Sequence, residues 1–171
     1  MSVRAFNKTA AIEAYERLQQ TLDGADVHIK HLEDQAKELY RSGNFQAAAN
    51  ILQMEIPRTR GTMKAVRAKM AQLRNAVALR LAEADAEIGM LLHVERFEDA
   101  LWLHFEHRPK IAAAAEAVGA TAGEIKEAVR TMNTLRKARA KPESMEEVLA
   151  AVDPRTAKQP NPYRLNPAES A

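Results

Sequence analysis

Apolar residues recur at steps of three and four positions from Thr9 to Val152, and no segment shows sustained alternation of apolar and polar residues. Steps of three and four place apolar side chains along one face of an α-helix, whereas alternation is typical of a β-strand. The pattern therefore predicts an all-α fold, a helical bundle, over this part of the chain.

Three interruptions divide the first sixty residues into predicted helices. Asp23-Gly24 follows the first apolar stripe, and glycine readily takes the left-handed conformation that caps a helix. Gly43 marks the second interruption. Pro57 marks the third, because proline lacks the N–H that a helix interior needs. We therefore expect helices over about residues 9–22, 27–40 and 45–56. Their stripes contain Ile12, Tyr15, Leu18, Leu22, Val27, Leu32, Ala36, Leu39 and Tyr40.

The longest predicted helix covers about residues 59–94. One narrow apolar seam continues along it for several turns, as in an arm of a helical hairpin or a coiled coil. Gly89 costs about 1 kcal/mol relative to alanine inside a helix and is the expected point of a bend or break. A further helix is expected over 97–107, ending before Pro109. The seam consists of Met63, Val66, Met70, Leu73, Val77, Leu81, Ala84, Ile88, Leu91 and Val94.

The C-terminal region changes in composition. A short helical pattern at 143–152 is followed by a stretch with four prolines and few apolar residues, which predicts an extended tail. We expect a helical, oligomerising part at 1–107, a second part at 108–141, and the short helix with its tail at 142–171.

Composition argues against most catalytic classes. The chain of 171 residues has no cysteine and only six glycines, and it lacks the glycine-rich phosphate-binding motifs. The His28/His31 and His104/His107 pairs lack further ligands for a metal site, and Glu13-x-x-Glu16 lacks the second half of a hydrolase motif. We therefore expect no enzyme activity, no cofactor and no metal.

Charge is arranged in blocks although the formal net charge is only +2. Residues 58–82 hold seven basic and no acidic side chains, 83–106 are mainly acidic, and 126–141 are again basic. On the long helix, helical spacing puts four basic residues on one face beside the seam. That face can contact a polyanion, or it can pair with acidic helices of this chain or of a neighbour. Its members are Arg60, Lys64, Arg67 and Arg74.

One segment has the spacing of a helix-turn-helix. Such a motif needs a small residue where its helices meet, a glycine four positions later to turn the chain, and an aliphatic residue six positions after that. Ala115, Gly119 and Ile125 have this spacing. Thr121 and Glu124 form a capping-box pattern, which predicts a new helix after the turn.

Over about residues 110–136 the chain thus resembles the helix-turn-helix of DNA-binding regulators. The resemblance implies a supporting helix at 110–118 and a recognition helix at 122–136. Ala122 and Gly123 depart from the usual pattern, because they offer no side chain for base readout. The residues that the resemblance assigns to DNA are Thr121, Lys126 and Arg130 in the major groove and Arg136, Lys137 and Arg139 on phosphates.

A second, weaker resemblance involves Gly43, Phe45 and Ala48, which are similar to the inter-helix turn of a single tetratricopeptide repeat. A related segment with Phe97 and Ala100 follows 52 residues later, a spacing that does not suit a tandem array. We expect two tight turns, each joining a pair of helices.

Two hypotheses of function follow. The first is a non-enzymatic, oligomeric protein that binds double-stranded DNA through the hairpin and the basic helical faces. The second is a structural or adaptor subunit of a large protein assembly, for example a virus particle, whose charged helices and tail bind neighbouring subunits. The N-terminus has no apolar signal core and no run is long enough for a membrane span, so we expect a cytoplasmic location (or a virus particle) and no membrane partner.

Overall fold

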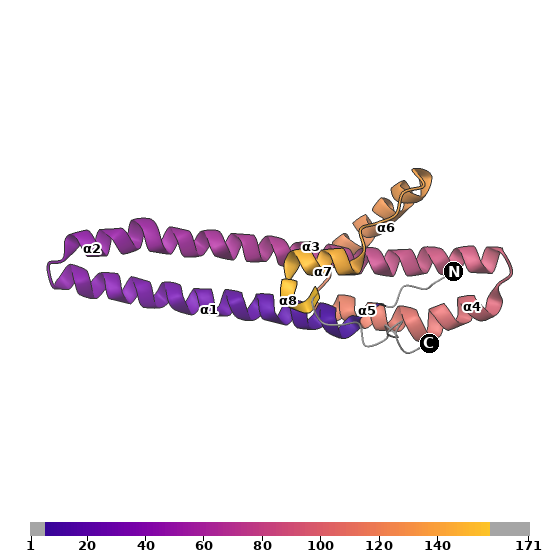
Figure 1. The fold of residues 1–171 in the computed structure, drawn as a ribbon, viewed down its shortest axis with the longest axis horizontal. Coiled ribbons are helices and arrows are strands. Elements are labelled where there is room, and N and C mark those ends of the chain that lie inside the picture. The colour runs from indigo at the N-terminus through magenta and orange to yellow at the C-terminus, as the bar shows by residue number, and fades with distance from the viewer. Residues whose placement is uncertain (1–5, 158–171) are drawn as a thin grey trace, which may run out of the picture.

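The computed structural model of the chain, which describes residues 6–157, is all-α (Figure 1). Helix α1 covers Lys8–Arg41. After a short turn, α2 (Phe45–Asn50), a π-helical turn η1 (Ile51–Glu55) and α3 (Ile56–His93) form one continuous helix of 49 residues. No strand occurs in this part of the chain.

The remaining helices begin after a second turn. α4 (Phe97–Trp102), a π-helical turn η2 (Leu103–His107) and α5 (Arg108–Ala117) are again continuous. Three separate helices follow, α6 (Ala122–Lys137), α7 (Met145–Val152) and α8 (Pro154–Ala157).

These helices form a long rod (Figure 1). α1 lies antiparallel to one half of the α2–α3 helix, and α4–α5 lies antiparallel to the other half. α7 lies along the rod near its middle, beside α3, whereas α6 leaves the rod at an angle. The two turns therefore lie at opposite ends. We call residues 40–54 tip A and residues 92–106 tip B.

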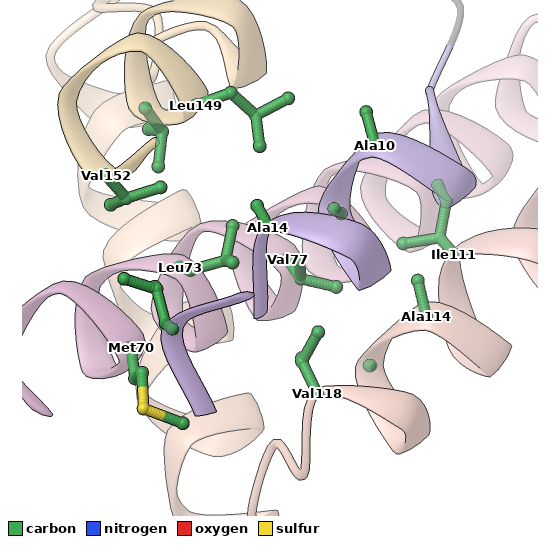
Figure 2. Packing of buried hydrophobic residues seen from close by; sticks show 14 of the residues in the cluster. Ala10, Ala14, Met70, Leu73, Val77, Ile111, Ala114, Val118, Leu149 and Val152 are labelled. Atoms are coloured by element: carbon green, nitrogen blue, oxygen red, sulfur yellow. The ribbon is translucent and has the colours of Figure 1, made fainter. Parts of the chain in front are cut away.

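The main core lies at the middle of the rod, where α1, α3, α5 and α7 meet (Figure 2). Small residues of α1 such as Ala11 and Ala14 are fully buried there and allow a close approach to Leu73 and Val77 of α3. Val118 enters from the end of α5, and Leu149 and Val152 from α7. Residues from all three expected parts join this cluster, so the three parts share one core. The expected division after residue 107 also falls within the continuous 97–117 helix.

Neither Pro57 nor Pro109 ends a helix, contrary to the expectation from the sequence. Each follows a π-helical turn, in which a backbone N–H bonds the carbonyl five residues earlier, as Ile56 does to Ile51. The wider turn lets the chain pass a proline, which lacks an N–H and whose ring would clash in a regular helix. The long helix therefore starts at residue 45 rather than 59.

The interruptions expected at Gly24 and Gly89 were also wrong. α1 passes through Gly24 and α3 passes through Gly89 without a break. Each glycine lies in a helix whose packing on its neighbour outweighs the roughly 1 kcal/mol that glycine costs.

Three members of the expected apolar stripes are exposed rather than buried, namely Val27, Tyr40 and Val94. Val27 lies on the outer face of α1, while Tyr40 and Val94 belong to the tips. The rest of the long seam is buried or half-buried as expected.

The two expected inter-helix turns are present and share one backbone design. Gly43 and Glu95, 52 residues apart, both have positive φ, at 82° and 59°. In each turn the next residue's N–H bonds the carbonyl five positions earlier, Asn44 to Leu39 (2.8 Å) and Arg96 to Leu91 (2.9 Å). Both π-helical turns and both prolines follow at the same spacing of 52 residues. The two tips are therefore equivalent in local structure.

Gly→Ala substitutions at Gly24 and Gly43 should change stability in opposite directions. Gly24 lies inside α1 with nothing near the position of an added Cβ, so Gly24→Ala should raise the free energy of unfolding by about 0.5–1 kcal/mol. At Gly43, φ is 82°, a conformation that alanine adopts only with strain, so Gly43→Ala should lower the free energy of unfolding by about 1 kcal/mol. Urea unfolding followed by circular dichroism measures both. A destabilised Gly24→Ala variant would contradict a continuous α1.

Candidate functional site

The hairpin between α5 and α6 has the local turn geometry that its sequence suggests. Gly119 has φ 68°, and Ala120 N–H bonds the Ala115 carbonyl at 2.8 Å, which closes the end of α5. The Thr121 hydroxyl accepts from the Glu124 N–H at 3.2 Å, and the Glu124 carboxylate accepts from the Thr121 N–H at 2.8 Å. The chain thus ends one helix and begins the next within four residues.

The two helices of the hairpin pack on α3 and not on each other. Ala115 and Val118 are buried in the central core, against α1 and α3. α6 packs elsewhere on α3, through Ala128 and Met132 against Ala78. In Figure 1, α6 points away from the α4–α5 helix. Ile125, the expected wedge residue at the start of α6, packs against both of these clusters, so the two helices of the hairpin meet through the shared core on α3 rather than directly.

The side chains expected to contact DNA divide into two groups. The Thr121 hydroxyl is engaged in the capping box, and Arg130 pairs with Glu127 at 3.3 Å. The other four are exposed and form no ion pair within residues 6–157: Lys126, Arg136, Lys137 and Arg139. Three of these lie at the outer end of α6, which leads away from the rod.

The expected basic face of the long helix is divided by pairing inside the molecule. Arg60 approaches Glu33 of α1 at 4.0 Å, and the Arg74 guanidinium donates to Glu124 of α6 at 3.0 Å. Of the four residues of this face, Lys64 and Arg67 are the two that are exposed and form no ion pair within the described chain. The charge blocks thus partly neutralise one another between helices.

Other ion pairs link neighbouring helices in the same way. Arg108 of α5 forms two bonds to Asp85 of α3, at 2.5 and 3.3 Å. Arg17 of α1 bonds Asp153, the residue between α7 and α8, at 3.0 Å. Arg80 pairs with Glu83 of its own helix α3 and also donates a hydrogen bond to the Glu143 carbonyl before α7. These bonds fix the positions of α5, α7 and the loop after α6 relative to the long helices.

The pKa values near the hairpin reflect this bracing. Burial opposes ionisation of Glu124, but the Thr121 N–H, the Arg74 guanidinium and the Thr121 hydroxyl all favour the carboxylate and lower its pKa. Burial likewise opposes the charge of Arg74, but Glu124 and the Tyr15 hydroxyl together raise its pKa. Both groups are therefore held in their charged forms.

Glu124→Gln should lower the free energy of unfolding at pH 7, by about 0.5–1.5 kcal/mol, because it removes a hydrogen-bonded charge. Since the folded pKa of Glu124 lies below its unfolded value of about 4.3, this contribution is present above that pH and is lost as the pH falls through the folded pKa. Urea unfolding at several pH values should show the two proteins converging in acid.

Glu127→Gln is the control, because the Glu127–Arg130 pair is exposed and should contribute less than about 0.5 kcal/mol. An equal loss in both variants would show that Glu124 has no special role.

A hollow on the surface lies between α3, α6 and α7. Small apolar side chains, including Ala68, Ala71 and Ala128, line most of it. Of its four charged side chains, Arg80, Glu124 and Glu127 are held in ion pairs, whereas Glu143 forms none within residues 6–157. The hollow thus offers mainly an apolar surface rather than reactive groups.

Exposed apolar residues at the tips are the feature that the sequence pattern did not reveal. Ten of the twelve large hydrophobic residues exposed in the described chain lie in tips A and B. Met54 and Phe105 are 69% and 66% exposed, respectively. Only the spacing of 52 residues between the two turn segments pointed to them. Tip A presents Tyr40, Phe45, Leu52 and Met54, and tip B presents Leu92, Val94, Phe97, Leu101, Trp102 and Phe105.

Aromatic rings pack against one another at both tips. At tip A, Tyr40 and Phe45 meet edge to face across the turn, with ring centroids 5.5 Å apart. At tip B, Trp102 stacks on His107 at 5.9 Å and His104 meets Phe105 edge to face at 4.8 Å. Burial and then Lys110 lower the pKa of His107, which favours the neutral form of the stacked imidazole. These pairs hold large apolar surfaces in fixed positions.

Comparison with known proteins adds no relationship. No family model, curated protein or solved structure matches this chain. The two resemblances noted above therefore rest on their own residues.

Within residues 6–157, no three His, Asp or Glu side chains gather where they could hold a metal ion. Over the same range, no helix combines the length and the apolar character that crossing a bilayer requires. His28 and His31 are both exposed on α1.

Proposed function

We propose that this protein is a non-enzymatic structural subunit of a protein assembly, joined to its neighbours through the two tips. The observation that carries this proposal is the concentration of exposed aromatic and aliphatic side chains at the ends of the rod. Large exposed apolar patches on a folded protein are typical of surfaces that bind other proteins. Aromatic residues in particular contribute much of the binding energy in such interfaces.

The architecture also favours a structural role. One helix of 49 residues joins the two tips and spans about 73 Å at 1.5 Å per residue. Ion pairs and the central core hold the other helices along it. A rod of this kind can hold two partners at a fixed separation.

Site-specific crosslinking tests the proposal, because the chain has no cysteine of its own. A photoreactive group is attached to a single cysteine at Gln46→Cys in tip A, at His104→Cys in tip B, or at Lys69→Cys on the middle of α3; all three positions are exposed. In an extract of the cells that make the protein, the tip positions should form protein crosslinks several-fold more often than Lys69→Cys. Equal crosslinking at all three positions, or none, would contradict the proposal.

DNA binding is a second candidate function, supported by the exposed basic end of α6. Arg136 and Lys137 border a shallow surface hollow with Asn133, and neither forms an ion pair within the described chain. Basic side chains in such a position suit phosphate contact, which positions a protein without reading sequence.

A fluorescence anisotropy titration with duplex DNA at several salt concentrations tests this candidate. Replacing both Arg136 and Lys137 by alanine should weaken binding and reduce the slope of log K against log salt by about 2, since each lost phosphate contact changes it by about 0.9. The matched pair Lys64→Ala and Arg67→Ala tests the face of α3 separately. Unchanged affinity in the Arg136/Lys137 variant would exclude α6 as a DNA contact.

A further inference from the structure

We infer that the partner of each tip is the opposite tip of a second copy of this chain, so that copies join end to end. The inference rests on the proposed structural function and names its partner. It follows from three properties of the tips, which are their shape, their charge and their placement on the rod.

The first property is the shared backbone design. Tips A and B have the same turn, the same positive φ position, the same π-helical turn and the same following proline. Each also presents a phenylalanine just after its turn, Phe45 in tip A and Phe97 in tip B, and both rings are exposed. Two apolar surfaces of related local structure are thus available on one molecule.

The second property is opposite charge. Tip A contains one charged residue, Arg41, which is exposed and forms no ion pair within residues 6–157. Tip B contains four acidic residues against Arg96 alone, and Asp99 is the acid that Arg96 pairs with, at 2.5 Å. The other three acids of tip B form no ion pair in the described chain: Glu95, Glu98 and Glu106.

Charge therefore favours contact between unlike tips. Two copies of tip B would bring like charges together, which costs free energy across an interface. Contact of tip A with tip B places Arg41 near the unpaired carboxylates and leaves the apolar rings to supply most of the binding. Just beyond tip A, exposed Arg58 is balanced by exposed Glu55, and Arg60 pairs with Glu33, so Arg41 is the charge that distinguishes this tip.

The third property is the position of the tips at opposite ends of the rod (Figure 1). A contact between two different surfaces is heterologous, and it does not close after two copies unless rotation brings the ends together. Tips that point in opposite directions repeat the contact along a line. The expected product is a linear chain of copies with an axial repeat of about 73 Å, the length of the 49-residue helix.

Sedimentation velocity of the purified full-length protein over a range of concentrations tests the inference, with negative-stain electron microscopy of the largest species. The unsubstituted protein should grow in mass with concentration. A tip-A variant (Phe45→Ser with Met54→Ser) and a tip-B variant (Trp102→Ser with Phe105→Ser) should each be monomeric, with affinity reduced at least about tenfold. All four side chains are exposed, so the helical content should not change.

Mixing the two variants gives the decisive result. Each variant retains one intact tip, so the mixture should form heterodimers that contain one copy of each variant, and nothing larger. Val129→Ser, an exposed valine on α6 away from both tips, is the control and should assemble like the unsubstituted chain.

Three results would overturn the inference. They are a protein that stays monomeric at every concentration, a tip variant that dimerises alone, and a mixture that remains monomeric.

If the pure protein is monomeric while both tips crosslink to another protein in the extract, the inference fails and the proposed function stands. If the pure protein polymerises but the tips crosslink to nothing in the extract, the proposed function fails instead.

Discussion

Leu73→Ala should lower the free energy of unfolding by about 2–5 kcal/mol, the largest single effect that we expect in this molecule. Leu73 is 0% exposed and belongs to the cluster in which α1, α3, α5 and α7 meet. The loss combines the transfer free energy of the removed side-chain atoms with the cost of the cavity. Neighbouring helices cannot close that cavity easily, because Ala11 and Ala14 already bring α1 into close contact. Urea unfolding monitored by circular dichroism measures the change.

Leu52→Ala is the matched control for Leu73→Ala. Both changes remove the same atoms from a leucine of the long helix, but Leu52 is 53% exposed at tip A. We expect its effect to lie within about 0.5 kcal/mol. Similar losses at both positions would show that the middle of the rod is not the principal core.

Ala78→Leu should release α6 from α3 at a cost of about 1–3 kcal/mol. Ala78 is fully buried between α3 and α6, in a cluster with Ala82, Ala128 and Met132. A leucine side chain cannot fit at this small-residue contact without displacing α6. Hydrogen exchange should therefore show faster exchange of the α6 amides, while the α1 amides remain protected because the central core does not include Ala78.

Ala65→Leu provides the control, because Ala65 is exposed on the same helix. Its effect on hydrogen exchange in α6 should be negligible. If Ala78→Leu leaves α6 fully protected, the Ala78 contact does not hold that helix.

The fold class and the long seam could be predicted because they follow directly from helical periodicity. From Met63 to Leu91 every seam residue is buried or half-buried, so the pattern identified the inner face of α3. Helix ends were less predictable at Gly24, Pro57 and Pro109. Glycine and proline weaken a helix locally, but packing along the rod and a π-helical turn compensate for this, and neither effect leaves a clear local signal in the sequence.

The candidate surfaces were predictable to a smaller extent. Spacing placed Gly119 and Thr121 correctly in a turn and a cap, because these depend on a few adjacent residues. Whether α5 and α6 pack together depends on contacts with α3, which the spacing does not contain. Arg74 likewise has the spacing of an exposed basic face, yet it bonds Glu124, fifty residues away. Exposure at the tips depends on where the rod ends, so periodicity assigned Tyr40 to the interior.

The continuous α2–α3 helix also has a mechanical consequence. Between Phe45 and His93 no loop interrupts the backbone, and the hydrogen bonds of a helix run nearly parallel to its axis. Tension or compression applied at the tips therefore passes along one column of hydrogen bonds, while the middle helices brace that column against buckling. The π-helical turn η1 near one end interrupts this regular column of hydrogen bonds. Under load the α2–α3 helix should therefore lose its hydrogen bonds first at η1 rather than at its centre.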